Sequence, residues 1–191
     1  MKIALIRNTK VDDYGGAESY QVSLAKELKK YDHNVSVICT SKKMLSIAES
    51  EGIEAVRGVL NARQNWSGIW NFLFPVYLVF QVKLYRWYKR YFKENDIEVV
   101  NIQSRDDWVA ATYAAKKLGI KVLWTDHMDF RSWVLQNVDN PIKNFIGKML
   151  MRVAKKADKI IFISDFEYDT LFSELKTLEN ENPNLLNQII D

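Results

Sequence analysis

The sequence predicts an α/β domain built on a doubly wound parallel sheet, and three observations support this prediction. Short apolar segments that suit buried strands alternate six times with segments of helical periodicity. Right-handed crossovers between such strands give a Rossmann-like sheet with helices on both faces. The 191 residues are 48% hydrophobic and 27% charged, which suits one globular domain and excludes a disordered chain.

The elements follow from apolar runs and from start and stop signals. The expected strands are residues 3–8, 34–40, 53–57, 98–102, 121–125 and 159–163. The expected helices are residues 17–31, 43–51, 69–93, 106–118, 141–156 and 165–175. Two of these helices end at glycines, Gly52 and Gly119. Two others have a proline near the start, Pro75 and Pro141, and Ser164 suits the N-cap of the last helix. The Asn-rich residues 176–191 receive no firm assignment.

Composition excludes several classes of protein. The single cysteine, Cys39, excludes an intrachain disulfide, and with only two histidines the chain has no zinc site of the usual kind. A net charge of +3 is too small to predict nucleic-acid binding. The apolar run at the N-terminus is too short for a signal peptide, so we expect a cytoplasmic protein.

The segment 66–82 is the most membrane-like part of the chain. It contains Asn71, Pro75 and Gln81 and is too short and too polar to predict a spanning helix. Basic and aromatic residues alternate after it, and one interpretation is a helix lying on an anionic membrane surface. The other interpretation is a core helix with a solvated basic face. The candidate membrane residues are Arg86, Trp87, Lys89, Arg90 and Lys93.

Loops at the carboxyl ends of the strands are the expected ligand-binding positions. Neither G-x-G-x-x-G nor a P-loop is present, which weakens dinucleotide and P-loop hypotheses. Gly15 and Gly16 follow the first strand and open a helix, where backbone amides favour a phosphate or another anion. A plain turn is the alternative, with Glu18 only complementing the helix dipole or holding the loop.

His127 directly follows the fifth strand, at the edge where this fold binds ligands. A histidine there can bind a sugar hydroxyl or transfer a proton near neutral pH, and Asp126 and Asp129 are candidates to orient it. His33 precedes the second strand, at the opposite edge, and is expected to be structural. No Ser-His-Asp set is supported.

Polar residues also follow the fourth strand and the His127 loop. Gln103 and Arg105 are candidate ligand contacts, with Arg105 suited to an anion. Asp106 and Asp107 are candidate helix caps, and we expect at least one of them to have that role. Arg131 suits an anionic or sugar-like group, and packing is an equal alternative.

The ordered set of motifs resembles the start of family 4 glycosyltransferases. The matching segments are Lys2–Ile6, Gly15–Glu18, Ala25–Leu28, His33–Ile38, Thr125–His127 and Ala157–Ser164. The resemblance covers about residues 1–175 and implies one half of a GT-B fold, in which two Rossmann-like domains enclose the active site. Such enzymes transfer a sugar from a nucleotide-sugar with retention, and the resemblance implies neither a metal nor another cofactor.

For this chain the resemblance implies an acceptor-side N-terminal domain over residues 1–175. Residues 176–191 would then be the start of the interdomain crossover or a truncated end. His127 would be the catalytic residue facing the transferred sugar, Gly15 and Gly16 would approach the donor phosphates or the acceptor, and Ser164 would lie at the cleft edge. The expected partners are a nucleotide-sugar, a glycan or lipid-linked acceptor, and a separate donor-binding domain or subunit.

Two departures from the family pattern matter. Asn101 and Gln103 occupy positions where the family often has histidines, and nothing after Ser164 resembles the paired-glutamate motif of the donor domain. The chain alone is therefore expected to have no transfer activity. The complete protein is expected to work at the inner face of a membrane. The first alternative is a non-catalytic subunit that pairs with a donor-binding chain at the membrane. The second is an unrelated nucleotide-binding enzyme.

Overall fold

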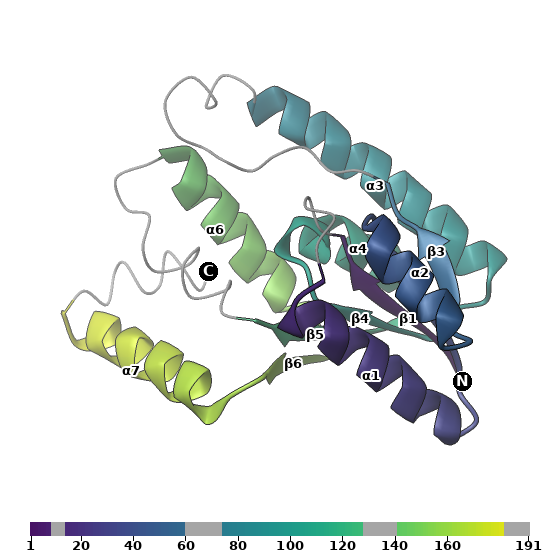
Figure 1. The fold of residues 1–191 in the computed structure, drawn as a ribbon. Coiled ribbons are helices and arrows are strands. Elements are labelled where there is room, and N and C mark those ends of the chain that lie inside the picture. The colour runs from purple at the N-terminus through teal and green to yellow at the C-terminus, as the bar shows by residue number, and fades with distance from the viewer. Residues whose placement is uncertain (9–13, 60–73, 128–140, 182–191) are drawn as a thin grey trace.

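The computed structural model describes residues 1–8, 14–59, 74–127 and 141–181, and within them it contains a six-stranded parallel sheet (Figure 1). The strands are β1 (Lys2–Arg7), β2 (Asn34–Cys39), β3 (Glu54–Arg57), β4 (Val99–Ile102), β5 (Lys121–Asp126) and β6 (Lys159–Phe162). The helices are α1 (Gly16–Lys30), α2 (Lys42–Ser50), α3 (Phe74–Glu94), α4 (Arg105–Lys117), α6 (Pro141–Ala154) and α7 (Asp165–Glu181).

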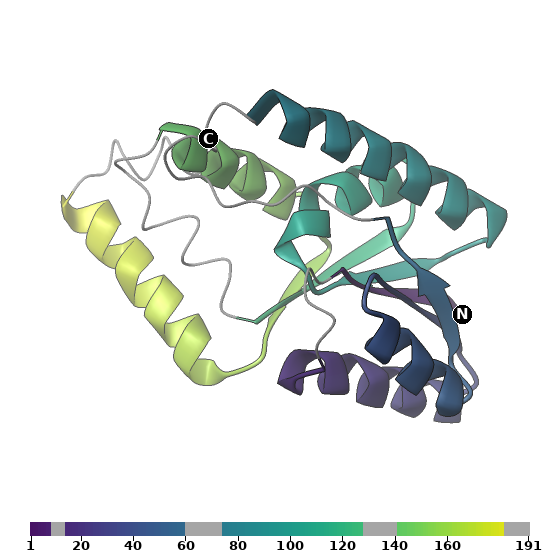
Figure 2. The same cartoon turned by 45° about the horizontal axis from the view of Figure 1, so that its top comes forward.

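The strand order is β3-β2-β1-β4-β5-β6, which confirms the doubly wound prediction. Helices α1 and α2 cover one face of the sheet, and α3, α4 and α6 lie over the other (Figure 2). The order reverses between β1 and β4, so α1 and α4 leave the sheet toward opposite faces. A crevice at the carboxyl ends of β1 and β4 is the usual consequence of such a switch point.

Two tryptophans form the centre of the core on the α4 side. Trp108 of α4 and Trp124 of β5 stack with their ring centroids 4.7 Å apart and an interplanar angle of 3°. Trp124 Nε1 donates a hydrogen bond to Thr112 Oγ1 at 2.9 Å, and Trp108 Nε1 donates to the carbonyl of Ile102 at 3.2 Å. Both buried indoles therefore keep a polar partner, as large aromatic side chains in a core require.

Helix α3 buries one face against α4 and the sheet. Tyr77, Gln81, Leu84, Tyr88 and Phe92 are its buried residues, and their spacing follows the helical period. The core interpretation is therefore confirmed for this face of α3, while the segment 60–73 lies outside the described residues.

No helix in the described ranges is long and apolar enough to cross a membrane.

The last helix is longer than predicted. Residue 175 was the expected end, whereas α7 continues to Glu181. Residues 176–181 contain neither glycine nor proline and include lysine, leucine and glutamate, which favour continuation of a helix. The end of this helix was therefore predicted too early in the chain. Strand β5 also continues one residue further than predicted and includes Asp126.

Candidate functional site

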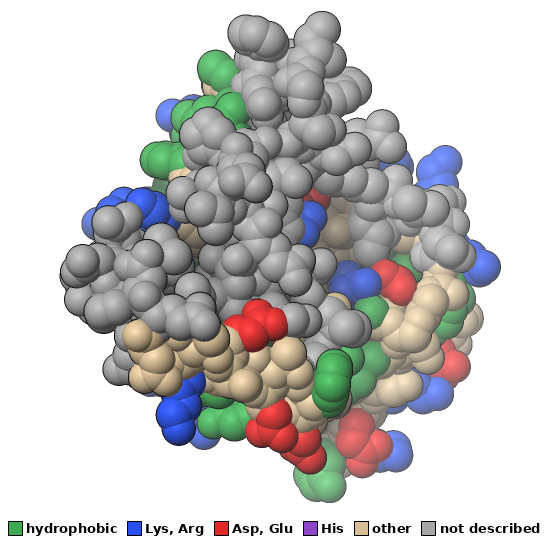
Figure 3. Space-filling view, turned by 90° about the vertical axis from the view of Figure 1, so that its left-hand side faces the viewer, with side chains coloured by type: hydrophobic (Ala, Val, Ile, Leu, Met, Phe, Trp, Pro, Cys, Tyr) green, Lys and Arg blue, Asp and Glu red, His purple; other side chains and the backbone are tan. Residues whose placement is uncertain are grey.

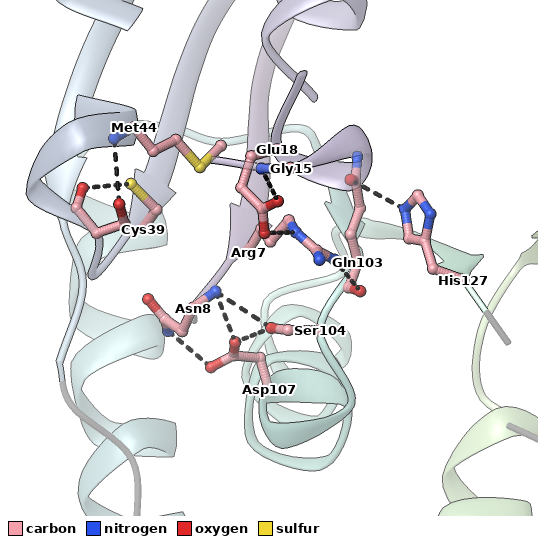
Figure 4. A network of polar contacts seen from close by, with 11 residues as sticks. Arg7, Asn8, Gly15, Glu18, Cys39, Met44, Gln103, Ser104, Asp107 and His127 are labelled. Atoms are coloured by element: carbon pink, nitrogen blue, oxygen red, sulfur yellow. Dashed lines mark hydrogen bonds and ion pairs between the residues drawn. The ribbon is translucent and has the colours of Figure 1, made fainter. Parts of the chain in front are cut away.

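The candidate site lies at the carboxyl edge of the sheet, next to the switch point. The ends of β1, β4 and β5 are neighbours there because these strands are adjacent in the sheet. Figure 3 looks onto this end of the molecule, where basic and acidic side chains lie next to each other. Parallel pairing thus brings together Arg7, Gln103 and His127, which are far apart in the sequence (Figure 4).

Glu18 fixes the glycine turn onto the first strand. Its Oε1 accepts a hydrogen bond from Arg7 Nε at 2.8 Å, and its Oε2 accepts one from the backbone amide of Gly15 at 3.0 Å. Burial alone would raise the pKa of Glu18, but the hydrogen bond and charge of Arg7 and the backbone amides bring this pKa below its usual range. Glu18 is thus ionised near neutral pH and has the loop-holding role that the sequence allowed.

The two glycines differ in their surroundings. A Cβ on Gly15 would lie 3.3 Å from Glu18 Oε2, whereas a Cβ on Gly16 would meet nothing within 4 Å. Gly15 has an extended backbone, with φ at −110°, so its conformation does not require glycine. Open space beside Gly16, at the N-terminal end of α1, is compatible with close approach of an anionic group to the backbone amides.

Gln103 connects the first strand to His127. Its side chain is 2% exposed, and its Oε1 lies 3.4 Å from His127 Nε2. Arg7 Nη1 donates to the backbone carbonyl of Gln103 at 3.3 Å, and the Tyr20 ring meets the His127 ring edge-on with centroids 5.6 Å apart. The Gln103 contact favours His127 with a proton on Nε2. Figure 4 shows Gln103 between the Arg7–Glu18 pair and His127.

The Nε2 atom of Gln103 is buried and has no hydrogen-bond partner within the described part of the chain. An unpaired buried amide donor is costly unless a ligand or water completes it. Asn101, the other residue at a position where the family often has histidine, is also buried. Its side-chain amide donates to Thr125 Oγ1 at 3.0 Å and is therefore satisfied by the sheet itself.

Two aspartates were candidates to orient His127, and that role stays a prediction for both. Asp126 is the last residue of β5 and is 2% exposed, so its place in a loop was predicted wrongly; β5 simply extends one pair further along β6. Asp129 and Arg131 lie outside the described residues. Among the described contacts of His127, the orienting amide comes from Gln103.

Arg105 and Ser164 occupy the expected ends of elements. Arg105 is the first residue of α4, and its Nε lies 4.0 Å from Asp106 Oδ1 in the same helical turn. Ser164 is exposed and directly precedes α7, as expected for its N-cap.

A buried polar network behind the site was missed by the sequence analysis. Asp107 is fully buried, and it accepts hydrogen bonds from Asn8 Nδ2 at 2.8 Å and Tyr88 Oη at 2.7 Å. Ser104 donates its hydroxyl to the same carboxylate, and the Asn8 backbone amide lies 3.3 Å from Asp107 Oδ2. Burial raises the pKa of Asp107 to about 6, although these hydrogen bonds oppose the shift.

This network corrects the expected capping role of Asp106 and Asp107. The N-cap of α4 is Ser104, and Asp107 is the third residue of the helix, in its first turn, where its carboxylate accepts a hydrogen bond from the end of β1 instead. The only available signal in the sequence was Asn8 itself, a polar residue at the end of the predicted strand 3–8. Tyr88 could not be assigned because its helical face and partner depend on tertiary packing.

Gly58→Ala is expected to destabilise the fold by about 1–3 kcal/mol, because a Cβ there would overlap Asn8 Oδ1 and displace a member of the buried network. The measurement is the free energy of unfolding from urea denaturation. Gly16→Ala is the matched control and should leave stability unchanged or slightly raised, since its Cβ meets nothing. Equal effects of the two substitutions would contradict the prediction.

The described residues contain no group of three or more His, Cys, Asp or Glu side chains placed to hold a metal ion.

The strand order and the polar edge define a doubly wound domain of the kind that forms one half of a GT-B fold. A sequence model of Glycosyltransferase Family 4 matches residues 14–178, and the chain therefore belongs to that family, as a domain like its N-terminal half. No curated protein sequence matches the chain significantly.

Solved structures share the fold at low sequence identity. A glycosyltransferase from Rickettsia africae ESF-5 is 19% identical with a TM-score of 0.59, over 95% of this chain and 39% of that one. The apo form of the lipopolysaccharide outer core galactosyltransferase WaaB is 16% identical with a TM-score of 0.61, over 91% and 42%. A UDP-GlcNAc 2-epimerase from Methanocaldococcus jannaschii is 13% identical with a TM-score of 0.56, over 91% and 42%.

These structural similarities establish only the fold, because glycosyltransferases and an epimerase share that fold. The chain spans about two fifths of the length of these structures, so it corresponds to one of the two domains of a GT-B protein.

Proposed function

We propose that this chain is the acceptor-binding half of a retaining glycosyltransferase, which transfers a sugar from a nucleotide-sugar to a glycan or lipid-linked acceptor at the cytoplasmic face of a membrane. The observation that carries the proposal is the pair Gln103 and His127 beside the Gly15–Gly16 turn, in a chain of family 4. These groups come from three adjacent strands and converge at the switch point, where doubly wound sheets bind ligands.

Each group has a role that fits sugar transfer. His127 binds a hydroxyl of the transferred sugar, and Gln103 orients the imidazole through its Oε1. The unpaired Nε2 of Gln103 is a further donor that a hydroxyl or water can complete. The amides at the start of α1, next to the open space at Gly16, stabilise the negative charge of the leaving phosphate.

The donor-binding half supplies the nucleotide site in this proposal, so catalysis depends on closing two domains around the substrates. Holding donor and acceptor in a reactive orientation then contributes most of the rate acceleration, together with charge stabilisation at the phosphate. The Arg7–Glu18 pair is a positioning element, because it holds the glycine turn against β1 without facing the site.

Ligand binding to the purified 191-residue chain tests this assignment. Saturation-transfer NMR would use a short-chain polyprenyl-diphosphate sugar, a panel of free oligosaccharides, and UDP and GDP as donor-side probes. We expect a glycan or the lipid-linked sugar to bind, the nucleotides to bind at least tenfold more weakly, and no sugar to be transferred. Gly16→Ala should weaken the residual binding of UDP and GDP while the chain stays folded, because its methyl group fills the open approach to the amides proposed to face the leaving phosphate.

Three results would overturn the proposal. Turnover of a nucleotide-sugar by the chain alone would show that no separate donor half is needed. Nucleotide binding tighter than that of every acceptor would assign the chain to the donor side. Tight binding of a dinucleotide would favour an unrelated nucleotide-binding enzyme.

A further inference from the structure

A groove opens on the outer side of α3 and α4, which pack against each other over one face of the sheet (Figure 1). It has a volume of about 560 Å³, which is within the usual size of a ligand-binding cleft. Its apolar lining consists of Leu78, Val82, Tyr85, Val109, Ala110 and Tyr113. Lysines from the last turn of α4 and from the residues after α6 complete it.

Gln81 gives this α3–α4 groove a polar atom that needs a partner. The residue is 7% exposed, and its Nε2 donates a hydrogen bond to the backbone carbonyl of Asp106 at 3.1 Å. Its Oε1 is buried and accepts no hydrogen bond within the described part of the chain. A buried acceptor without a donor is costly, so a ligand gains affinity by bringing an N–H or O–H group to this oxygen. The acyl chain of a lipid has no such donor, whereas several protein side chains have one.

The rim of the groove is positive on both sides. On the α4 side, Lys117 is exposed and makes no ion pair with the described residues, and Lys156 Nζ lies 5.8 Å from the centroid of the Tyr113 ring. On the α3 side, Lys83 and Arg86 are exposed and line an adjoining hollow of about 400 Å³. Cations therefore border the apolar lining along both helices.

The helical layer around the groove has few carboxylates to neutralise these cations. Lysines and arginines occur in α3, α4 and α6, whereas the carboxylates of these helices are Glu94 at the end of α3 and Asp106 and Asp107 in the first turn of α4. Helices α1 and α2, on the other face of the sheet, carry lysines and glutamates together. An acidic partner is attracted to the first layer, and a second copy of this chain would bring like charges together.

We infer that the α3–α4 groove binds an acidic amphipathic helix of a partner protein. The apolar stripe of that helix fills the groove, and its carboxylates pair with Lys117 on one side and with Lys83 and Arg86 on the other. The inference stands on the shape, charge and unpaired acceptor of this surface, so it does not depend on the sugar chemistry proposed above.

The dimensions of the groove define the length and the anchor of the bound helix. Helix α4 rises about 12 Å from Val109 to Lys117, so two to three turns of the partner helix cover the groove. A tryptophan in its apolar stripe packs on Tyr85 and Tyr113 and donates its indole N–H to Gln81 Oε1.

Trp87, one of the candidate membrane residues, does not line this groove. Its ring is half-buried and stacks on the Tyr91 ring, with centroids 5.5 Å apart and an interplanar angle of 5°. The ring therefore packs along α3, and the apolar contacts from α3 come from earlier residues such as Leu78 and Val82.

Fluorescence anisotropy with the full 191-residue chain tests the inference. The probe is a synthetic, fluorescein-labelled peptide of 18 residues, with leucines and one central tryptophan on one helical face and glutamates on the other. We expect it to bind at least tenfold more tightly than a scrambled peptide of the same composition. The same margin is expected over a peptide with lysines in place of the glutamates.

Two substitutions with the same change of charge locate the binding surface. Lys117→Glu should weaken binding of the acidic peptide at least fivefold. Lys116 is less suited to this test because it already pairs with Asp158. The matched control is Lys42→Glu at the start of α2, an exposed lysine on the other face of the sheet, which should keep the affinity within twofold.

A double-mutant cycle tests the contact with Gln81. Phenylalanine in place of the peptide tryptophan removes the N–H donor, and Gln81→Met removes the acceptor at similar side-chain size. The unmodified chain should prefer the tryptophan peptide at least threefold, and Gln81→Met should lose this preference. The peptide substitution leaves the chain unaltered, so equal affinity of the unmodified chain for both peptides would remove Gln81 from the contact even where Gln81→Met fails to fold.

Absence of saturable peptide binding, or equal binding of the acidic and basic peptides, would overturn the inference. So would an equal loss in Lys117→Glu and Lys42→Glu, because binding would then follow net charge. Phosphatidylglycerol vesicles that retain the unmodified chain but not Lys117→Glu, together with no peptide binding, would assign the groove to lipid. None of these measurements involves a sugar, so their failure leaves the acceptor-binding proposal to its own test.

Discussion

An Asp107→Ala variant is expected to lose about 2–4 kcal/mol of unfolding free energy at pH 7. The substitution leaves the Asn8 amide group, the Ser104 hydroxyl and the Tyr88 hydroxyl without their shared acceptor in a buried position. Each unsatisfied buried donor costs roughly 1–3 kcal/mol, and relaxation of the site offsets part of the sum. Urea denaturation followed by circular dichroism measures the difference.

Asp165→Ala provides the comparison for this loss. Asp165 is also an aspartate in the first turn of a helix, but it is exposed, so its removal should cost less than about 1 kcal/mol. A loss in Asp107→Ala no larger than in Asp165→Ala would show that the buried network does not stabilise the fold.

The contribution of the same carboxyl group to folding stability depends on pH, and its direction follows from the raised pKa. An unfolded aspartate has a pKa near 3.9, whereas burial raises the pKa of Asp107 to about 6 in the folded chain. Between these values the folded state holds the proton more tightly, so the contribution of Asp107 to stability falls as pH rises from about 4 to 6. Asp107→Asn removes this titration, and wild type should lose about 3 kcal/mol relative to that variant across the window.

Among the three described carboxyl groups with shifted pKa values, only Asp107 is expected to change stability between pH 4 and 6. Glu18 and Asp158 have lowered pKa values, that of Asp158 about 2, so their stabilising contributions are lost at more acidic pH. Parallel stability curves for wild type and Asp107→Asn between pH 4 and 7 would contradict the assignment of the raised pKa.

His127→Ala should lower sugar transfer at least tenfold in an enzyme that contains this chain together with its donor-binding half. The imidazole is held at the ligand edge by Gln103 Oε1 at 3.4 Å and by the Tyr20 ring, and its removal takes a positioned hydrogen-bonding group from the proposed site. The measurement is the initial rate at saturating nucleotide-sugar, with the unfolding free energy of each variant recorded beside it.

His33→Ala is the natural control because His33 precedes β2 at the opposite edge of the sheet. It should leave the transfer rate within twofold of the unmodified enzyme. Gln103→Ala should lower the rate less than His127→Ala, since it loosens the imidazole without removing it. Equal rates for His127→Ala and the unmodified enzyme would remove His127 from the site.

The architecture was predictable because it depends on local patterns. Buried parallel strands are short apolar runs, and glycines such as Gly52 and Gly119 mark some of the element boundaries, so six strands and their order of connection followed from the sequence. The end of α7 was misplaced because no glycine or proline follows Leu175 before Pro183, and only tertiary context sets where such a helix stops.

The site was only partly predictable. His127, Gln103, Gly15 and Glu18 were identified because each directly follows a predicted strand or opens a helix. The sequence could not show which of these residues touch, because Gln103 and His127 are in contact although they are 24 residues apart in the chain.

The buried network was unpredictable for the same reason. Its members come from the end of β1, from α3 and from the start of α4, and they meet only through the packing of α3 across the sheet. A single sequence gives no signal for contacts of this kind.

The position of β1 in the middle of the sheet affects how the chain folds while it is being synthesised. The ribosome synthesises β1 first, yet its partner on one side, β4, starts at Val99, and Asn8 is separated from Asp107 by 99 residues. Until that later segment emerges, β1 has one neighbour and an exposed edge that other chains can pair with. Closing such a long loop is slow, so the nascent chain is most vulnerable to aggregation before α4 is complete.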